Sequence, residues 1–156
     1  MRLRVIAVGT RMPAWVDSAV TDYSARLPAD LAVEWREIRA EARGASGSPA
    51  VWLQREAERI EAAIPQGAWR VVLDERGRDV DTRQLAQRLS QWRERAAPVA
   101  LLIGGPDGLA SELKQGANEN LRLSSLTLPH PLVRVLLAEQ LFRAWSILTG
   151  HPYHRD

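Results

Sequence analysis

The sequence predicts an α/β fold, with a mainly parallel sheet flanked by helices. Strand-length apolar runs alternate with helix-length amphipathic stretches along the whole chain. The run at residues 99–103 is apolar throughout, which is typical of a strand covered on both faces. The 156 residues contain no internal repeat, low-complexity segment or break in composition. We therefore expect a single domain over residues 1–156.

Residues 1–64 predict a strand, a helix, a second strand and a second helix. The first strand is an apolar run that ends at Gly9. Proline bounds the first helix, since Pro13 suits a first helical turn and Pro28 stops the helix. The second strand alternates apolar and polar residues, and the second helix is amphipathic and ends before Pro65. The expected elements are 3–8, 13–27, 31–38 and 49–64.

Residues 70–126 continue the alternation. A short apolar strand runs into an expected turn at residues 75–77, and Thr82 is the expected N-cap of the next helix. The buried strand at 99–103 is followed by a short helix and an extended segment. The expected elements are 70–74, 82–96, 99–103, 109–118 and 121–126.

The helix expected over residues 132–149 is apolar on almost every side. Such a helix must be buried all round, and in a small protein a subunit interface is a natural cover. Glu139 and Arg143 form an i,i+4 pair on one face. Arg134 lies about 180° away from Arg143 around the helix. We therefore expect the two arginines to serve different sites, one in its own subunit and the other facing a partner subunit or RNA.

Composition limits the function classes. The formal charge is +2, and Lys114 is the only cation among 21 that is not arginine. Arginine suits phosphate and base contacts in RNA, but a codon bias that favours arginine over lysine explains the same excess of arginine. The loop at 41–49, which carries Arg43, is open to either an RNA contact or a role as a solvated connector. The chain has no cysteine and no apolar run of about 18 residues, so we expect a cytoplasmic protein without disulfides or a membrane span.

The turn Gly104-Gly105-Pro106-Asp107-Gly108 closes the apolar strand at 99–103. Parallel sheets bind ligands at the carboxyl ends of their strands, and glycine lets the backbone approach a ligand closely or adopt positive φ. Gly-x-Gly-x-x-Gly is absent and no Gly-Lys-Ser/Thr follows, so this is neither a dinucleotide fingerprint nor a P-loop. A ligand-binding turn and a plain tight turn both remain open.

Two further segments carry unusual chemistry. Leu128-Pro129-His130-Pro131 is a stiff extended segment at a helix start. Its backbone donors and acceptors are held in place and could recognise the edge of a planar base, or the segment could simply be a rigid helix start. His130 is by default a loop or capping residue. The tail 150–156 offers base stacking, proton transfer and phosphate contact, although many C-termini fray. His151 and His154 lack the cysteines or clustered carboxylates that would complete a metal site, so no metal is expected.

Together these segments resemble the SPOUT superfamily of methyltransferases. More narrowly, the chain is similar to small members that methylate N3 of a pseudouridine in large-subunit rRNA. The resemblance covers essentially the whole chain and has highly specific motifs near the C-terminus. The matching stretches are residues 5–10, 12–13, 101–109, 125–135, 143–147 and 151–155.

The resemblance implies a C-terminal trefoil knot, a homodimer and S-adenosylmethionine as cofactor. It also implies that the substrate is helix 69 of the 23S rRNA within an assembled 70S ribosome. Carried over onto this chain, the cofactor would be bound by Leu73, Gly105, Ser124, Ser125, Leu126, Thr127, Leu128 and Pro129.

The resemblance and the polar tail together suggest catalytic roles. His154 or Tyr153 would handle the N3 proton, and Arg143 or Arg155 would stabilise charge and grip phosphate. Arg134 and Arg155 are the expected RNA contacts. Two alternatives remain open: a related SPOUT enzyme that acts on transfer RNA, and a non-catalytic ribosome-binding factor without cofactor affinity.

Overall fold

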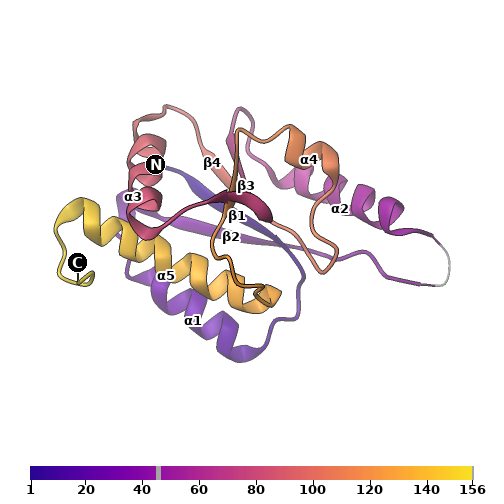
Figure 1. The fold of residues 1–156 in the computed structure, drawn as a ribbon, viewed down its shortest axis with the longest axis horizontal. Helices are drawn as coiled ribbons and strands as arrows, with labels where there is room; N and C mark the ends of the chain where they lie inside the picture. The colour runs from indigo at the N-terminus through magenta and orange to yellow at the C-terminus, as the bar shows by residue number, and fades with distance from the viewer. Residues whose placement is uncertain (45–46, 156) are drawn as a thin grey trace.

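The computed structural model describes residues 1–44 and 47–155 and has the predicted α/β architecture (Figure 1). The described chain forms a five-stranded sheet in the order β2-β1-β4-β3-β5, with every neighbouring pair parallel. β4 is buried at all five positions, as its apolar sequence predicts. The strands are β1 (Leu3–Val8), β2 (Val33–Ile38), β3 (Trp69–Asp79), β4 (Val99–Ile103) and β5 (Glu119–Arg122).

Helices cover both faces of the sheet. One apolar core joins the sheet to α3 and α5, with α1 packed beside α5, and a second core joins the opposite face to α2 and α4 (Figure 1). Alternate residues of β1 serve the two cores: Val5 lies in the first and Ile6 in the second. The helices are α1 (Ala14–Ala25), α2 (Pro49–Ala63), α3 (Thr82–Glu94), α4 (Ser111–Gln115) and α5 (His130–Thr149), with a 3-10 helix η1 (Ala29–Leu31) before β2.

The turn predicted at residues 75–77 is wrong, because β3 continues through it to Asp79. β3 passes the same residue of β5 twice: Leu121 is the register partner of both Leu73 and Arg78. Gly77 permits this crossing, since a Cβ there would lie 2.6 Å from the carbonyl carbon of Leu121. The backbone segments therefore touch at a position that only glycine allows. The trefoil knot stays a prediction.

Other boundaries also differ from the sequence prediction. Asp81, not Thr82, is the N-cap of α3, because its side chain accepts the amide of Gln84 in a capping box. The helix predicted over 109–118 is only five residues long and ends before Gly116. The final strand begins at Glu119 and ends at Arg122, earlier than expected.

The long helix α5 is not buried all round by its own chain. Leu137, Leu141 and Phe142 lie in the core, whereas Val135 is half-buried and 37% of Leu148 is exposed. An apolar helix with uncovered apolar residues favours a further packing partner. The homodimer remains a prediction. Within the described residues, no helix is both long enough and apolar enough to cross a membrane.

Candidate functional site

A cleft opens at the carboxyl end of β4, beside the middle of β3, at the sheet edge where parallel folds bind ligands. Its larger cavity, about 570 Å³, lies among residues 73–76 of β3, the turn after β4, α4 and the start of α5. A smaller cavity of about 260 Å³ lies between the same residues of β3 and the loop after β5. The cavities share the walls formed by Leu73, Thr127, Leu128 and Val133, so they are two lobes of one cleft.

The glycine turn on one wall packs tightly against itself. Gly108 has φ +78° and its amide donates to the carbonyl of Gly105 over 2.9 Å. A Cβ on Gly104 would lie 2.5 Å from the carbonyl carbon of Gly108, and one on Gly105 would lie 3.1 Å from Val8 Cγ1. Close packing within the chain therefore restricts Gly104 and Gly105, and positive φ favours glycine at Gly108. These contacts are those of a tight turn, and ligand binding by the turn stays a prediction.

The loop before α5 forms the opposite wall. Leu126 donates its amide to the Ser124 hydroxyl over 2.9 Å, and its own side chain is 74% exposed. Pro129 is the N-cap of α5, with φ −66° and ψ 146°, and is not a lining residue. Every other residue expected to bind the cofactor lines the cleft, namely Leu73, Gly105, Ser124, Ser125, Leu126, Thr127 and Leu128.

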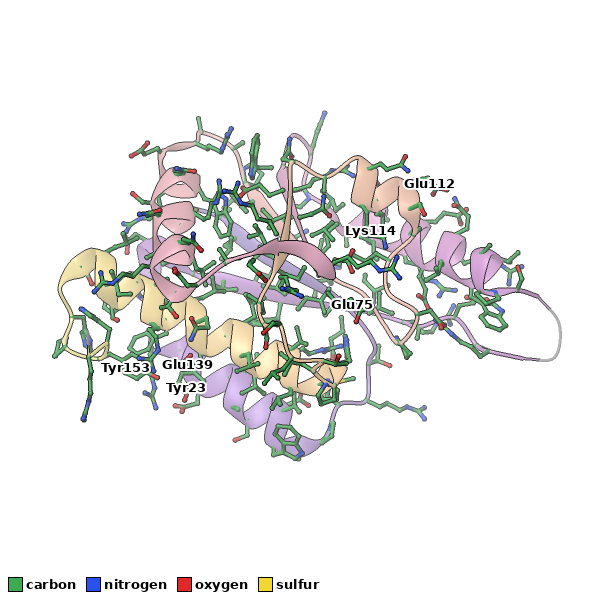
Figure 2. All side chains as sticks on the ribbon, in the orientation of Figure 1. Tyr23, Glu75, Glu112, Lys114, Glu139 and Tyr153 are labelled. Carbon is green, nitrogen blue, oxygen red and sulfur yellow. The ribbon has the colours of Figure 1, made fainter. Side chains whose placement is uncertain are left out.

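Sequence reasoning missed the charged residues of the cleft. Asp74, Glu75, Arg76 and Lys114 all line the larger cavity, and Figure 2 labels Glu75 and Lys114. Lys114 Nζ lies 3.6 Å from Asp74 Oδ2. Two signals were present in the sequence: Asp74 ends a predicted strand, and Lys114 is the only lysine of the chain.

His130 sits where α5 meets the cleft. Its Nε2 accepts a hydrogen bond from Arg134 Nε at 3.2 Å, which requires that nitrogen to be unprotonated. Burial lowers the pKa of His130 and the Arg134 guanidinium lowers it further, against backbone acceptors at Gly104 and Val8 that raise it. A neutral His130 therefore joins α5 to the ends of β1 and β4. Within the described residues, no cluster of His, Cys, Asp or Glu could hold a metal ion.

Arg134 is buried and bound within its own chain. Its guanidinium donates to the carbonyl of Gly9 at 2.7 Å, to that of Val8 at 3.2 Å and to Glu37 Oε2 at 2.6 Å. Only 4% of its side chain is exposed. The structure thus gives the predicted RNA contact of Arg134 no support, since the guanidinium fastens α5 to the ends of β1 and β2.

The predicted catalytic residues gather at the other end of α5. Tyr153 donates its hydroxyl hydrogen to Glu139 Oε1 at 2.9 Å, and Figure 2 labels both residues. Arg143 Nε donates to the same oxygen at 2.7 Å. The Arg143 guanidinium also lies over the Tyr153 ring, 4.8 Å from its centroid. Burial and, after it, the hydrogen bond to Glu139 raise the pKa of Tyr153 to about 12. The tail is therefore docked on α5 through specific contacts.

His154 is oriented by Ser146. The Ser146 hydroxyl donates to the carbonyl of Arg143 at 2.7 Å, and His154 Nδ1 lies 3.1 Å from the same hydroxyl oxygen. A hydroxyl has a single proton to donate, so His154 Nδ1 carries the hydrogen in this contact. In that tautomer Nε2 of a neutral imidazole is an acceptor, and it has no hydrogen-bond partner among residues 1–44 and 47–155. Arg155, the other expected RNA contact, is exposed.

The two groups of predicted site residues do not meet within one chain. His130 and Arg143 are thirteen residues apart on α5, which is about 20 Å at the α-helical rise. The cleft lies at the N-terminal end of this helix, and the tail packs on its last turns. A single chain thus has a ligand cleft and a separate cluster of Tyr153, Arg143 and His154.

Comparisons with known proteins agree with this architecture. The structure is similar to that of a probable methylase family protein from Haemophilus influenzae, with a TM-score of 0.59 and 11% identity over 99% of this chain and 70% of the other. It is also similar to a probable methyltransferase from Bordetella pertussis, with a TM-score of 0.53 and 17% identity over 92% and 95% of the two chains. At these identities the likeness shows the fold alone.

Sequence comparison is more specific. A protein named ribosomal RNA large subunit methyltransferase H from Bordetella petrii is 61% identical over 155 residues, 99% of both chains. A protein of the same name from Methylibium petroleiphilum is 56% identical over the full length of both chains. The family model described as "Predicted SPOUT methyltransferase" matches residues 1–154. The chain therefore belongs to the SPOUT methyltransferase family, within the group that shares the name ribosomal RNA large subunit methyltransferase H.

Proposed function

We propose that the chain uses S-adenosylmethionine to methylate N3 of a pseudouridine in helix 69 of 23S rRNA, on the assembled 70S ribosome. Membership in the SPOUT family supports methyl transfer, and members of this family generally use S-adenosylmethionine. The name of the full-length relatives supports a large-subunit rRNA substrate. The observation that carries the proposal is the cleft, because it gathers residues expected to bind the cofactor from three separate segments of the chain.

The cleft suits the cofactor in size and chemistry. Ligand pockets typically occupy about 300–1,000 Å³, and the larger lobe falls within this range. Leu73 and Leu128 offer apolar walls to a planar adenine, and Asp74 and Glu75 suit a positive sulfonium. When bound, the cofactor supplies an electrophilic methyl group. The chain's own contribution is to orient both reactants and exclude water, which is where most of the catalytic effect of a group transfer arises.

The tail cluster supports an assignment of the proton step. At neutral pH Tyr153 stays protonated, since its pKa is raised to about 12, so its phenol acts as a donor. His154 has a free Nε2 when neutral, and we assign it as the acceptor of the pseudouridine N3 proton. Arg143, held by Glu139, would stabilise the anion that develops, and the exposed Arg155 would contact phosphate.

The separation of the cleft and the tail supports a homodimer with shared sites. One chain cannot bring His154 to its own cleft along a rigid helix, so we propose that the partner's tail closes each site. Exposed apolar side chains offer surface for this contact: 55% of Trp15 on α1 and 37% of Leu148 on α5 are exposed. α1 and α5 lie side by side, so one interface can include both (Figure 1).

Methyl transfer from labelled S-adenosylmethionine tests the proposal directly. The purified chain is incubated with 70S ribosomes, deproteinised 23S rRNA or transfer RNA, and rRNA fragments are analysed by mass spectrometry. We expect one methyl group on one pseudouridine, with assembled ribosomes as the only effective substrate. Methylation of bare transfer RNA would favour the related SPOUT enzyme. Absence of cofactor binding in calorimetry would favour the non-catalytic ribosome-binding factor.

Mixing variants tests the shared site. One variant lacks residues 151–156, and the other carries Gly104→Ala, which disrupts the cofactor turn. Each homodimer is expected to be inactive, while half of the randomly mixed dimers contain one intact site. Activity should therefore recover to about a quarter of the wild-type value. Full activity of the deletion variant alone would contradict the role of the tail, and failure of the mixture to recover would contradict sharing.

A further inference from the structure

Arg43 connects three parts of the molecule that are distant in sequence. Its Nη1 donates to Glu56 Oε2 on α2 and to the backbone carbonyl of Glu41, each at 2.5 Å. Its Nε and Nη2 donate to Asp107 Oδ2 at 3.1 and 3.0 Å. The guanidinium also lies 5.5 Å from the ring centroid of Trp52. Arg43 belongs to the loop at 41–49 for which an RNA contact was open, yet its guanidinium is bound by Glu56 and Asp107 of its own chain.

Burial fixes the inner end of this linkage. Glu56 is 2% exposed, and its Oε2 accepts the Glu41 amide at 2.8 Å as well as Arg43. Its Oε1 has no hydrogen-bond partner within the described part of the chain. A buried carboxylate is costly without a cation, so Arg43 is held there strongly, unlike a solvent-exposed ion pair. The hydrogen bond to Glu56 accordingly raises the pKa of Arg43.

The outer end of the linkage is part of the cofactor cleft. Asp107 lies within the glycine turn and lines the larger cavity, and 41% of its side chain is exposed. Glycine-rich segments have many accessible conformations, and the internal bond of this turn is the one from the Gly108 amide to the Gly105 carbonyl. A side-chain tie from Asp107 to a buried anchor therefore restricts the turn where a ligand would contact its backbone.

We infer that Arg43 is a positioning residue, which uses buried Glu56 as its anchor to hold Asp107 and the glycine turn in the shape that receives the cofactor. The inference rests on the proposed function for the identity of the ligand, whereas the tie itself concerns the ligand-free chain. A turn released from Arg43 must be ordered again when the ligand binds, and that ordering lowers affinity. We expect affinity for S-adenosylmethionine to fall about tenfold.

Two measurements test this inference on the full-length chain. Calorimetry gives the Kd for S-adenosylmethionine, and hydrogen exchange at the Gly108 amide reports how often the turn opens without ligand. Arg43→Ala and Asp107→Ala should each raise Kd and speed exchange about tenfold. The double variant should show no larger change in Kd or in exchange rate than either single variant, because both substitutions remove the same link. Asp107→Asn keeps an acceptor oxygen and should restore most of the affinity.

Matched controls separate positioning from a general loss of stability. Arg55→Ala removes a cation that contacts Glu41 in the same loop but has no bond to Asp107, so Kd and exchange should not change. Arg43→Ala leaves buried Glu56 unpaired, and adding Glu56→Gln removes that charge. The combined variant should regain melting temperature while its Kd stays raised.

Three outcomes would overturn the inference: Asp107→Ala with wild-type exchange at Gly108, additive effects in the double variant, or equal weakening by Arg55→Ala. If the wild-type chain itself failed to bind S-adenosylmethionine, the proposed function would be wrong. The exchange data would still decide whether Arg43 holds the turn.

Discussion

Substituting Arg134 with methionine separates a structural role from an RNA contact. Methionine retains much of the volume of the side chain but removes every donor. The lost hydrogen bonds are those to the carbonyls of Val8 and Gly9, to the carboxylate of Glu37 and to the ring of His130. With only 4% of the Arg134 side chain exposed, water cannot simply replace the guanidinium.

The expected loss of stability follows from these partners. Glu37 is 43% exposed, so solvent can hydrate its carboxylate and the lost ion pair contributes little. The two carbonyl bonds are charge-assisted and lie at the ends of packed strands, and each contributes about 1.5–3 kcal/mol. We therefore expect a decrease in the free energy of unfolding of about 3–6 kcal/mol. For a chain of this size that lowers Tm by about 6–24 °C.

Differential scanning calorimetry of Arg134→Met beside Arg143→Met provides the measurement. Arg143 is one-third exposed, and in Arg143→Met its partner Glu139 still accepts the hydrogen bond from the Tyr153 hydroxyl. We therefore expect that variant to melt within about 4 °C of the wild type. Ribosome binding at a temperature where both variants are folded completes the comparison. Wild-type melting of Arg134→Met together with lost ribosome binding would refute the structural role and restore Arg134 as an RNA contact.

Three other perturbations test the site. Gly104→Ala should cost about 1–3 kcal/mol and abolish cofactor binding, because its Cβ would lie 2.5 Å from a backbone carbon. Gly44→Ala is the matched control, because a Cβ there would meet nothing within 4 Å. It should change neither the melting temperature in scanning calorimetry nor the Kd for S-adenosylmethionine in titration calorimetry. The lowered pKa of His130 means that below its ordinary value of 6.5 the unfolded chain binds a proton that the folded chain does not, so stability should fall with acid. His130→Gln should reduce that fall in urea titrations at pH 5 and 7, and an unchanged fall would contradict the assignment. Tyr153→Phe should lose about 0.5–1.5 kcal/mol with its bond to Glu139 yet keep the pH–rate profile, which a catalytic phenolate would not allow.

Local chemistry made most of the sheet predictable. The apolar run of β4 requires cover on both faces, and proline sets the limits of α1 and the start of α2. The glycine turn was recognisable because closely packed backbone and positive φ need glycine at Gly104 and Gly108. These are constraints that a residue imposes on itself or on near neighbours, so the sequence alone displays them.

Long-range contacts account for what sequence reasoning missed. In the sequence Gly77 looks like an ordinary turn glycine. In the structure the backbone of Leu121, which is distant in sequence, packs directly against it. Arginine side chains are usually exposed. Nothing near Arg134 in the sequence indicates that the backbone carbonyls of Val8 and Gly9 accept its hydrogen bonds. Arg43 is a similar case, since its partner Asp107 is 64 residues away. Such pairings depend on the completed topology.

Helix α5 explains why the proposed site needs two copies. Its twenty residues span about 30 Å, with the proposed cofactor cleft at one end and the docked tail at the other. Arg134 fastens the start of α5 to the end of β1, and the bond from Tyr153 to Glu139 docks the tail on the same helix, so moving the tail to its own cleft would break these contacts. A two-fold axis makes every contact between the two chains occur twice, once from each chain. Two α5 helices paired antiparallel would therefore place the cleft of each chain beside the tail of the other. In the proposed homodimer, therefore, one association would complete both sites together, and a monomer would bind cofactor without transferring its methyl group.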